Sequence, residues 1–164
     1  MLLMYEQAYG SVAEDYIHFV DHLHKATIQR IGKMTTPRDR LRPPPAERFA
    51  GSEHLIDLVS EVRSLRNEPH DGKNSHSQIT LFHSGSLRIV LFAFEAGGGL
   101  PAHHAPGFVV IHTIRGAVSV KTPTETHKLT ASQILTLAPE IVHDVRADEE
   151  ADILVTVSLT SESL

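Results

Sequence analysis

The sequence contains no cysteine and no tryptophan, and only 5% of its 164 residues are aromatic. Without cysteine, the chain can form neither disulfide bonds nor thiolate metal sites, which is compatible with a reducing cytosol. No apolar run approaches the roughly 18 residues of a membrane-spanning helix, and the apolar run at the start is too short for a signal peptide. We therefore expect a cytoplasmic protein without a membrane partner.

Positive charge is also scarce, since 15 Lys and Arg stand against 20 Asp and Glu and give a net charge of −5. Nucleic-acid binding relies on clustered basic residues, and the chain has no long basic run. We therefore do not expect nucleic acid as a partner. A hydrophobic content of 41% is enough for one ordinary core.

Histidine, in contrast, is abundant, with 12 residues in the chain. Imidazole is the commonest metal ligand in a protein that lacks cysteine. The count favours a metal site, provided that several of these side chains cluster in space.

The first third of the chain has the pattern of helices joined by extended chain. Residues 12–31 predict an amphipathic helix, because a capping-box pattern precedes apolar residues at three- and four-residue spacing. Four prolines at 35–45 predict an extended strap, and helical spacing returns at 53–66. We therefore predict an N-terminal extension, residues 1–52, followed by the main domain, residues 53–164.

From residue 78 onward the pattern changes to short β-branched and aromatic runs separated by turn residues. These runs are 79–82, 87–94, 108–114, 117–120, 134–137 and 153–159. Many short strands without alternating helices predict an all-β antiparallel sandwich or barrel.

Residues 97–116, GGGLPAHHAPGFVVIHTIRG, resemble the first signature motif of the cupin family. That motif reads Gly, five residues, His-x-His, three or four residues, Glu, six residues, Gly. Its positions align, in order, with Gly97, His103, Ala105, Val109 and Gly116.

Residues 132–145, SQILTLAPEIVHDV, are similar to the second cupin motif, which reads Gly, five residues, Pro-x-Gly, two residues, His. Alignment on His143 puts Ser132 and Glu140 at the two glycine positions. The resemblance implies a small RmlC-like cupin: a double-stranded β-helix, or jelly-roll barrel, with an N-terminal helical extension.

Cupin metal sites take two His and one Glu from the first motif and one His from the second. The aligned residues here are His103, Ala105, Val109 and His143, so two ligands of four are replaced. In one interpretation, His103 and His143 hold a divalent transition metal (Fe, Ni, Zn or Cu). His104 is then the candidate third ligand, with His83 or a nearby carboxylate as alternatives. In the other, the two histidines bond each other or water.

Strand alternation directs Val109, Ile111 and Thr113 toward the barrel interior, and His112 toward the outside. Together with Ala105, these inward residues predict a pocket at the barrel mouth for a small molecule.

Three functions are compatible with this pattern: a small-molecule binding or sensing module without chemistry, a metal-dependent enzyme such as a dioxygenase or isomerase, and a dimeric interaction protein. The residues do not decide whether the protein is an enzyme. A homodimer is expected in all three cases, since small cupins commonly pair through sheet faces.

Overall fold

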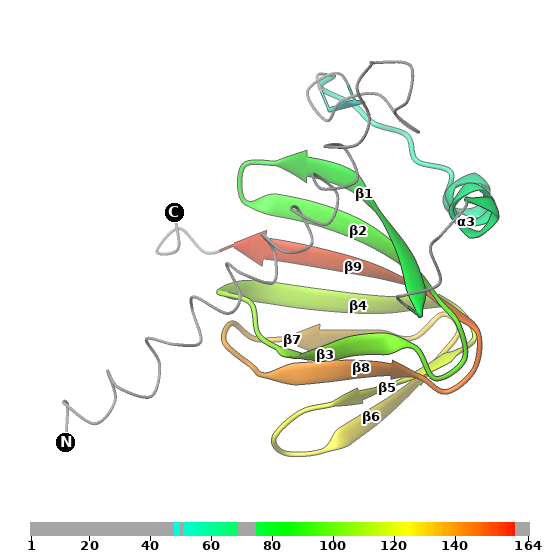
Figure 1. Ribbon diagram of the computed structural model, residues 1–164. Coiled ribbons are helices and arrows are strands. Elements are labelled where there is room, and N and C mark those ends of the chain that lie inside the picture. The colour runs from blue at the N-terminus through cyan, green and yellow to red at the C-terminus, as the bar shows by residue number, and fades with distance from the viewer. Residues whose placement is uncertain (1–47, 50, 69–74, 160–164) are drawn as a thin grey trace, which may run out of the picture. The chain divides into compact units, whose positions relative to one another are not determined.

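The computed structural model describes residues 48–49, 51–68 and 75–159 of the chain (Figure 1). The predicted helix at 12–31 and the proline-rich strap lie outside these residues, and the predicted boundary between residues 52 and 53 stays a prediction. None of the helices in the described ranges is long and apolar enough to cross a membrane.

The described residues form one helix and nine strands, and every strand pairing is antiparallel. The elements are α3 (Leu58–Asn67), β1 (His76–Ser84), β2 (Leu87–Phe94), β3 (Gly99–His103), β4 (Gly107–Arg115), β5 (Ala117–Lys121), β6 (Thr126–Thr130), β7 (Ile134–Leu137), β8 (His143–Ala147) and β9 (Ala151–Leu159).

The strands make two sheets, one in the order β1-β2-β9-β4-β7 and the other in the order β3-β8-β5-β6. Figure 1 shows β1, β2, β9 and β4 side by side. Strands that are distant in sequence therefore become neighbours, as β9 lies between β2 and β4. The all-β antiparallel fold predicted from the short runs is confirmed.

The five-stranded sheet has an inner and an outer face, which the alternation along β4 defines. Val109, Ile111 and Thr113 are buried, whereas Phe108, which directly precedes Val109, is 55% exposed. Directly opposed residues of paired strands share a face. The inner face therefore continues onto β9 through Val157, which pairs with Val109.

Helix α3 begins later than the predicted range of 53–66. The Asp57 side chain accepts hydrogen bonds from the backbone N–H groups of Val59 (3.0 Å) and Ser60 (3.3 Å). It is therefore the N-cap, and residues 53–57 are not helical. The fully buried Leu65 of α3 packs on the outer face of β1 and β2, against Ile79, Leu81, Leu91 and Ala93.

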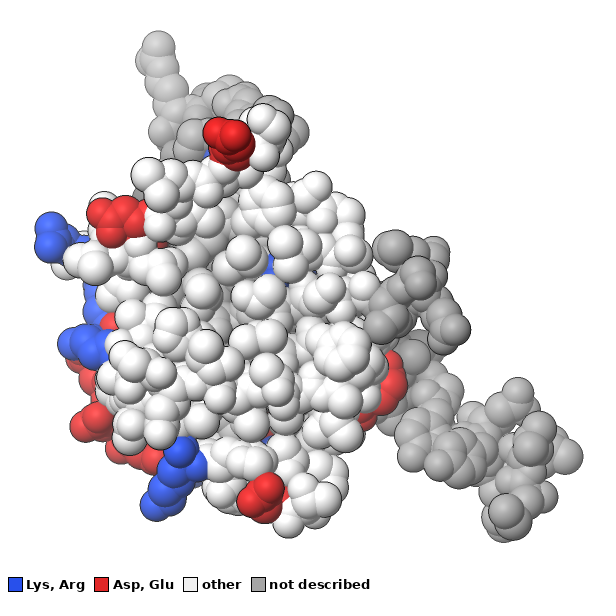
Figure 2. All heavy atoms as spheres, turned by 180° about the vertical axis from the view of Figure 1, so that it is seen from behind, with Lys and Arg blue, Asp and Glu red and all other residues white. Residues whose placement is uncertain are grey.

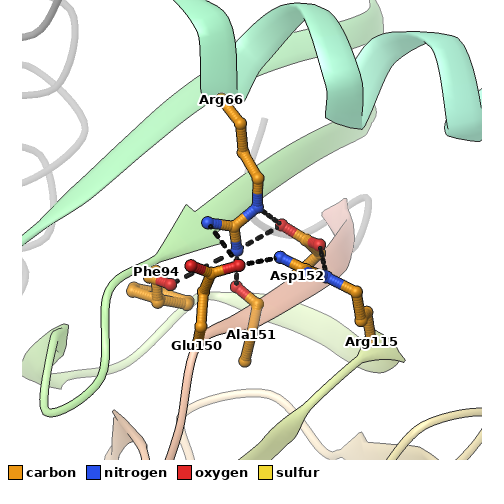
Figure 3. A network of polar contacts seen from close by, with 6 residues as sticks. All are labelled: Arg66, Phe94, Arg115, Glu150, Ala151 and Asp152. Carbon is orange, nitrogen blue, oxygen red and sulfur yellow. Dashed lines mark hydrogen bonds and ion pairs between the residues drawn. The ribbon is translucent and has the colours of Figure 1, made fainter.

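Asp152 of β9 is the centre of a polar network that joins α3 to the sheet (Figure 3). Its fully buried carboxylate accepts hydrogen bonds from Nε of Arg66 (2.9 Å) and from Nε of Arg115 (2.8 Å). Arg66 also donates to the carbonyl oxygens of Phe94 and Ala151. Because a buried carboxylate is costly unless it is paired, the network attaches α3 firmly to β9.

Candidate functional site

The inner face of the five-stranded sheet is more deeply buried at one end than at the other. Phe92, Phe94 and Ile153 are buried near the end of β4 at Arg115. Val90 and Val157, nearer the start of β4, are partly exposed. We call these the filled end and the open end of the barrel.

The structure puts the four predicted pocket residues in buried positions. Val109, Ile111 and Thr113 follow one another on the inner face of β4, and Ala105 is buried in the segment before it. His112 lies on the opposite face of the same strand. Whether the four line a ligand pocket stays a prediction.

Further inner-face residues at the open end were missed by sequence reasoning. Strand pairing puts them in the same cross-strand rows as Val109 and Ile111, on the same face, and they are partly exposed. They are Thr80, Arg88, Val90, Leu135, Val155 and Val157. Alternation alone could not reveal them, because the sequence does not specify which strands are neighbours.

Two buried polar atoms toward the filled end have no hydrogen-bond partner: Oγ1 of Thr113 and Oε1 of Gln78. Both residues belong to one inner-face row, because Gln78 pairs with Phe92, Phe92 with Ile153, and Ile153 with Thr113. An unpaired buried polar atom costs about 1–3 kcal/mol. A bound water would be stabilised at either atom.

His103 and His143 meet because their strands are paired. They are directly opposed residues of β3 and β8, next to an irregularity in the register that follows Leu100. Their ring centroids are 4.4 Å apart and the ring planes are inclined by 53°. His103 is followed closely by the start of β4, so the pair lies at the open end.

Each imidazole of the pair is anchored to a carbonyl two residues earlier. Nδ1 of His103 donates to the carbonyl oxygen of Pro101 (2.7 Å), and Nδ1 of His143 donates to that of Ile141 (2.8 Å). Because a carbonyl oxygen only accepts, Nδ1 carries the proton in both rings. In the neutral rings, both Nε2 atoms are therefore unprotonated and act as hydrogen-bond acceptors.

Both rings are held in the neutral form. Burial, and next the positive charge of a protonated His143, lower the pKa of His103 to about 4. Burial also lowers the pKa of His143, although the hydrogen bond to Ile141 acts in the opposite direction. At neutral pH the pair is therefore uncharged and offers hydrogen-bond acceptors.

His104, the candidate third ligand, is buried and contacts Glu140. Its Nδ1 is 2.7 Å from Oε2 of Glu140, whose side chain is largely exposed. The backbone N–H of Glu140 donates to the carbonyl oxygen of Ala105 (2.8 Å). The loop that carries Glu140 is thus attached to the segment after His103 at two points.

A complete metal site is not present in the part of the chain that the structure describes. No group of three or more His, Cys, Asp or Glu in these ranges is arranged to hold a metal ion. His103 and His143 supply two nitrogen ligands, whereas a catalytic zinc site usually takes three protein ligands. These residues therefore fit only part of the coordination shell.

The four residues aligned with motif glycines share one backbone feature, a positive φ: Gly97 (79°), Gly116 (75°), Ser132 (69°) and Glu140 (65°). Left-handed backbone costs a residue with a side chain about 1–2 kcal/mol, and glycine avoids this cost. Both motif segments thus retain their turns, although two glycines are replaced.

The comparisons with known proteins agree with this fold. Residues 89–159 match the AraC-like ligand binding domain family. A conserved protein of unknown function from Streptococcus pyogenes is 22% identical, with a TM-score of 0.55 over 66% of this chain and 91% of that chain. An RmlC-like cupin from Shewanella frigidimarina is 20% identical, with a TM-score of 0.54 over 68% of this chain and 95% of that chain.

The chain has the cupin fold. The same fold is found in KdgF from Halomonas sp., which is 16% identical, with a TM-score of 0.52 over 59% of this chain and 92% of that chain. No curated protein matches the sequence. The resemblance to the cupins read from the two motif segments is thus confirmed, and the cupin barrel carries a pair of neutral histidines at its open end.

Proposed function

We propose that the open end of the cupin barrel binds a small molecule and that His103 and His143 recognise it through hydrogen bonds. The observation that carries this proposal is the anchoring of both Nδ1 atoms on backbone carbonyls, at 2.7 and 2.8 Å. It leaves Nε2 unprotonated in both neutral rings, whose centroids are 4.4 Å apart, so that each Nε2 can accept a hydrogen bond.

The chemistry of the surroundings indicates the class of ligand. Two neighbouring acceptors suit a molecule that donates two hydrogen bonds, such as one with adjacent hydroxyl or amide groups. The partly exposed Val90, Val155 and Val157 suit an apolar portion of the same molecule. Ala105 and Val109, at positions where cupins have metal ligands, add apolar surface.

Binding without chemistry is favoured over a metal-dependent dioxygenase or isomerase. A catalytic metal needs a third protein ligand, and no described residue completes the shell around His103 and His143. The similarity to a ligand-binding domain family over residues 89–159 supports the same choice.

A ligand panel followed by NMR would test the proposal. We expect at least one member of a panel of polyols, monosaccharides and hydroxy amides to shift the ring signals of His103 and His143 and to raise Tm. The response should disappear in His103→Ala and persist in His112→Ala, which removes an imidazole from the outer face. If only Zn²⁺, Ni²⁺ or Fe²⁺ moves these signals, the metal interpretation replaces this one, and no response at all would refute both.

We further propose that two copies of the chain meet at the outer face of the five-stranded sheet. Its described residues on β4 and β7 include no Lys, Arg, Asp or Glu between Phe108 and Ile114 or from Ile134 to Leu137, and Phe108 and Ile134 are 55% and 58% exposed. In the view from behind, charges gather at the edges of a broad uncharged surface (Figure 2). In a symmetric dimer each face meets its own copy, so an uncharged face avoids repulsion.

Light scattering on Phe108→Glu would test this dimer, because the variant puts like charges together at the interface. We expect the wild type to have twice the mass of the chain and the variant to be a monomer. Thr126→Glu, a change at an exposed position of β6, is the control and should remain dimeric. A monomeric wild type would refute the dimer.

A further inference from the structure

We infer that Glu140 is a positioning residue that fixes the orientation of the His143 ring. The inference rests on the proposed function, because it assigns a role within the same ligand site. It starts from a residue whose backbone conformation is unfavourable for its own side chain.

Glu140 has a φ of 65°, in the left-handed region that favours glycine. The aligned position of the second cupin motif is glycine, and glycine here would avoid a cost of about 1–2 kcal/mol. Backbone strain of this kind persists where the surrounding contacts require it, and it is concentrated at functional sites. A carboxylate at this position therefore needs an explanation other than the turn itself.

Two contacts of Glu140 and one of its neighbour Ile141 connect this loop to the histidine pair. Its Oε2 lies 2.7 Å from Nδ1 of His104, the residue that follows His103. Its backbone N–H donates to the carbonyl oxygen of Ala105 (2.8 Å). The next residue, Ile141, provides the carbonyl oxygen to which Nδ1 of His143 donates (2.8 Å). The peptide that orients His143 thus directly follows the residue that attaches the loop.

Polar contacts have to hold this loop, because little apolar burial does so. Ile141 and Val142 are 38% and 42% exposed. Loss of the Glu140 carboxylate would leave the backbone bond to Ala105 as the attachment at this residue. The carbonyl of Ile141 could then move relative to the ring of His143, and its Nδ1 proton would no longer be fixed.

The test uses Glu140→Gly, which removes the carboxylate, relieves the strain and keeps the backbone N–H. Side-chain ¹⁵N NMR of the free protein reports which ring nitrogen of His143 carries the proton. We expect the wild type to give a single Nδ1–H tautomer and Glu140→Gly to lose it, with the two ring nitrogen signals moving toward each other. Glu140→Gln keeps an oxygen acceptor and should retain the wild-type signals.

Two further variants separate positioning from a general effect on folding. Ser132→Gly relieves the same kind of strain at the other turn, 69° in φ, and should leave the His143 signals unchanged. His104→Ala removes the partner of the carboxylate and should reproduce the loss of the fixed tautomer. A folded Glu140→Gly that retains the Nδ1–H tautomer of His143 would overturn the inference. Because no ligand is used, this result is independent of the ligand panel.

Discussion

The two motif segments of this cupin-fold chain differ in what they have retained. The first keeps glycine at both left-handed positions, but Ala105 and Val109 replace two of its three ligands. The second keeps its ligand, His143, but Ser132 and Glu140 replace both glycines. The backbone turns and the metal ligands of the motif can therefore be lost separately.

The turns of the second segment persist because tertiary hydrogen bonds hold them. The backbone N–H of Ser132 donates to the carbonyl oxygen of Thr113 (2.7 Å), and that of Glu140 donates to Ala105. Both bonds join a turn of the second segment to the first segment, residues 97–116. Hydrogen bonds to the first segment thus stabilise the left-handed turns of the second segment.

The largest effect is expected from replacing a glycine in the first segment. In Gly116→Ala the new Cβ would overlap the carbonyl oxygen of Glu150 as well as strain the backbone. We expect a loss of about 3 kcal/mol in the free energy of unfolding, measured by urea denaturation.

Gly97→Ala is the matched control, because φ is again positive but open space surrounds the position of its Cβ. Its loss should be confined to the backbone strain, about 1–2 kcal/mol. Equal losses of unfolding free energy in Gly97→Ala and Gly116→Ala would mean that the overlap with the carbonyl oxygen of Glu150 does not contribute.

Restoring the missing ligands would sharpen the comparison. The double variant Ala105→His and Val109→Glu adds a third and a fourth ligand next to His103 and His143. At a Zn²⁺ concentration one hundred times Kd, binding should stabilise it by about 2.7 kcal/mol, seen as a rise in Tm. The control double variant, Ala105→His with Val110→Glu, puts the carboxylate on the outer face. Zn²⁺ should therefore stabilise it less. A double variant that responds to Zn²⁺ no more than the wild type would contradict this expectation.

An intermediate effect is expected from acid, since the neutral histidine pair belongs to the native state. The pKa of His103 is about 4 in the folded protein and about 6.5 in the unfolded chain. Protonation therefore favours unfolding. The stability that neutral His103 contributes is complete above about pH 6.5 and is lost as the pH falls through 4.

The measurement compares wild type and His103→Asn by denaturation between pH 7.5 and 4 in the presence of a chelator. The wild type should lose stability more steeply than the variant over this range. Parallel curves would show that burial does not hold His103 neutral.

The smallest effect is expected from Ser132→Gly, which restores the second motif's first glycine. Relief of left-handed strain should exceed the entropy that glycine loses on folding, for a net gain of about 1 kcal/mol in thermal unfolding. Ala131→Gly, one residue earlier and without a positive φ, should lose stability instead. A loss in both variants would show that the turn does not strain Ser132.

Sequence alone predicted strands where β-branched and aromatic residues are dense, as in β2, β4 and β9. It did not include β3, β6 and β8 among the strand-like runs, because GLPAH, THKLT and HDVRA are rich in residues such as Pro, His, Lys, Asp and Arg. β3 is an edge strand, where Pro101 is tolerated. The motif spacing aligned His103 and His143 in a shared site even though their strands were not recognised.

The finer features of the site depend on contacts that sequence does not specify. The anchoring of each Nδ1 requires a backbone carbonyl in a particular orientation two residues earlier. The motif alignment showed Glu140 only as a residue at a glycine position. Its contact with His104 depends on the path of the loop, which the sequence does not specify. Residues such as Val155 and Val157 required the order of the strands in the sheet.

Helix α3 gives the barrel a practical boundary. Leu65 covers the apolar outer face of β1 and β2, and Arg66 is paired with Asp152. A version of the protein that begins at β1 would therefore expose this apolar face and remove one of the two arginines that pair with Asp152. A shortened version of the protein, produced by itself or fused to another protein, therefore has to begin before Asp57, so that helix α3 keeps its N-cap.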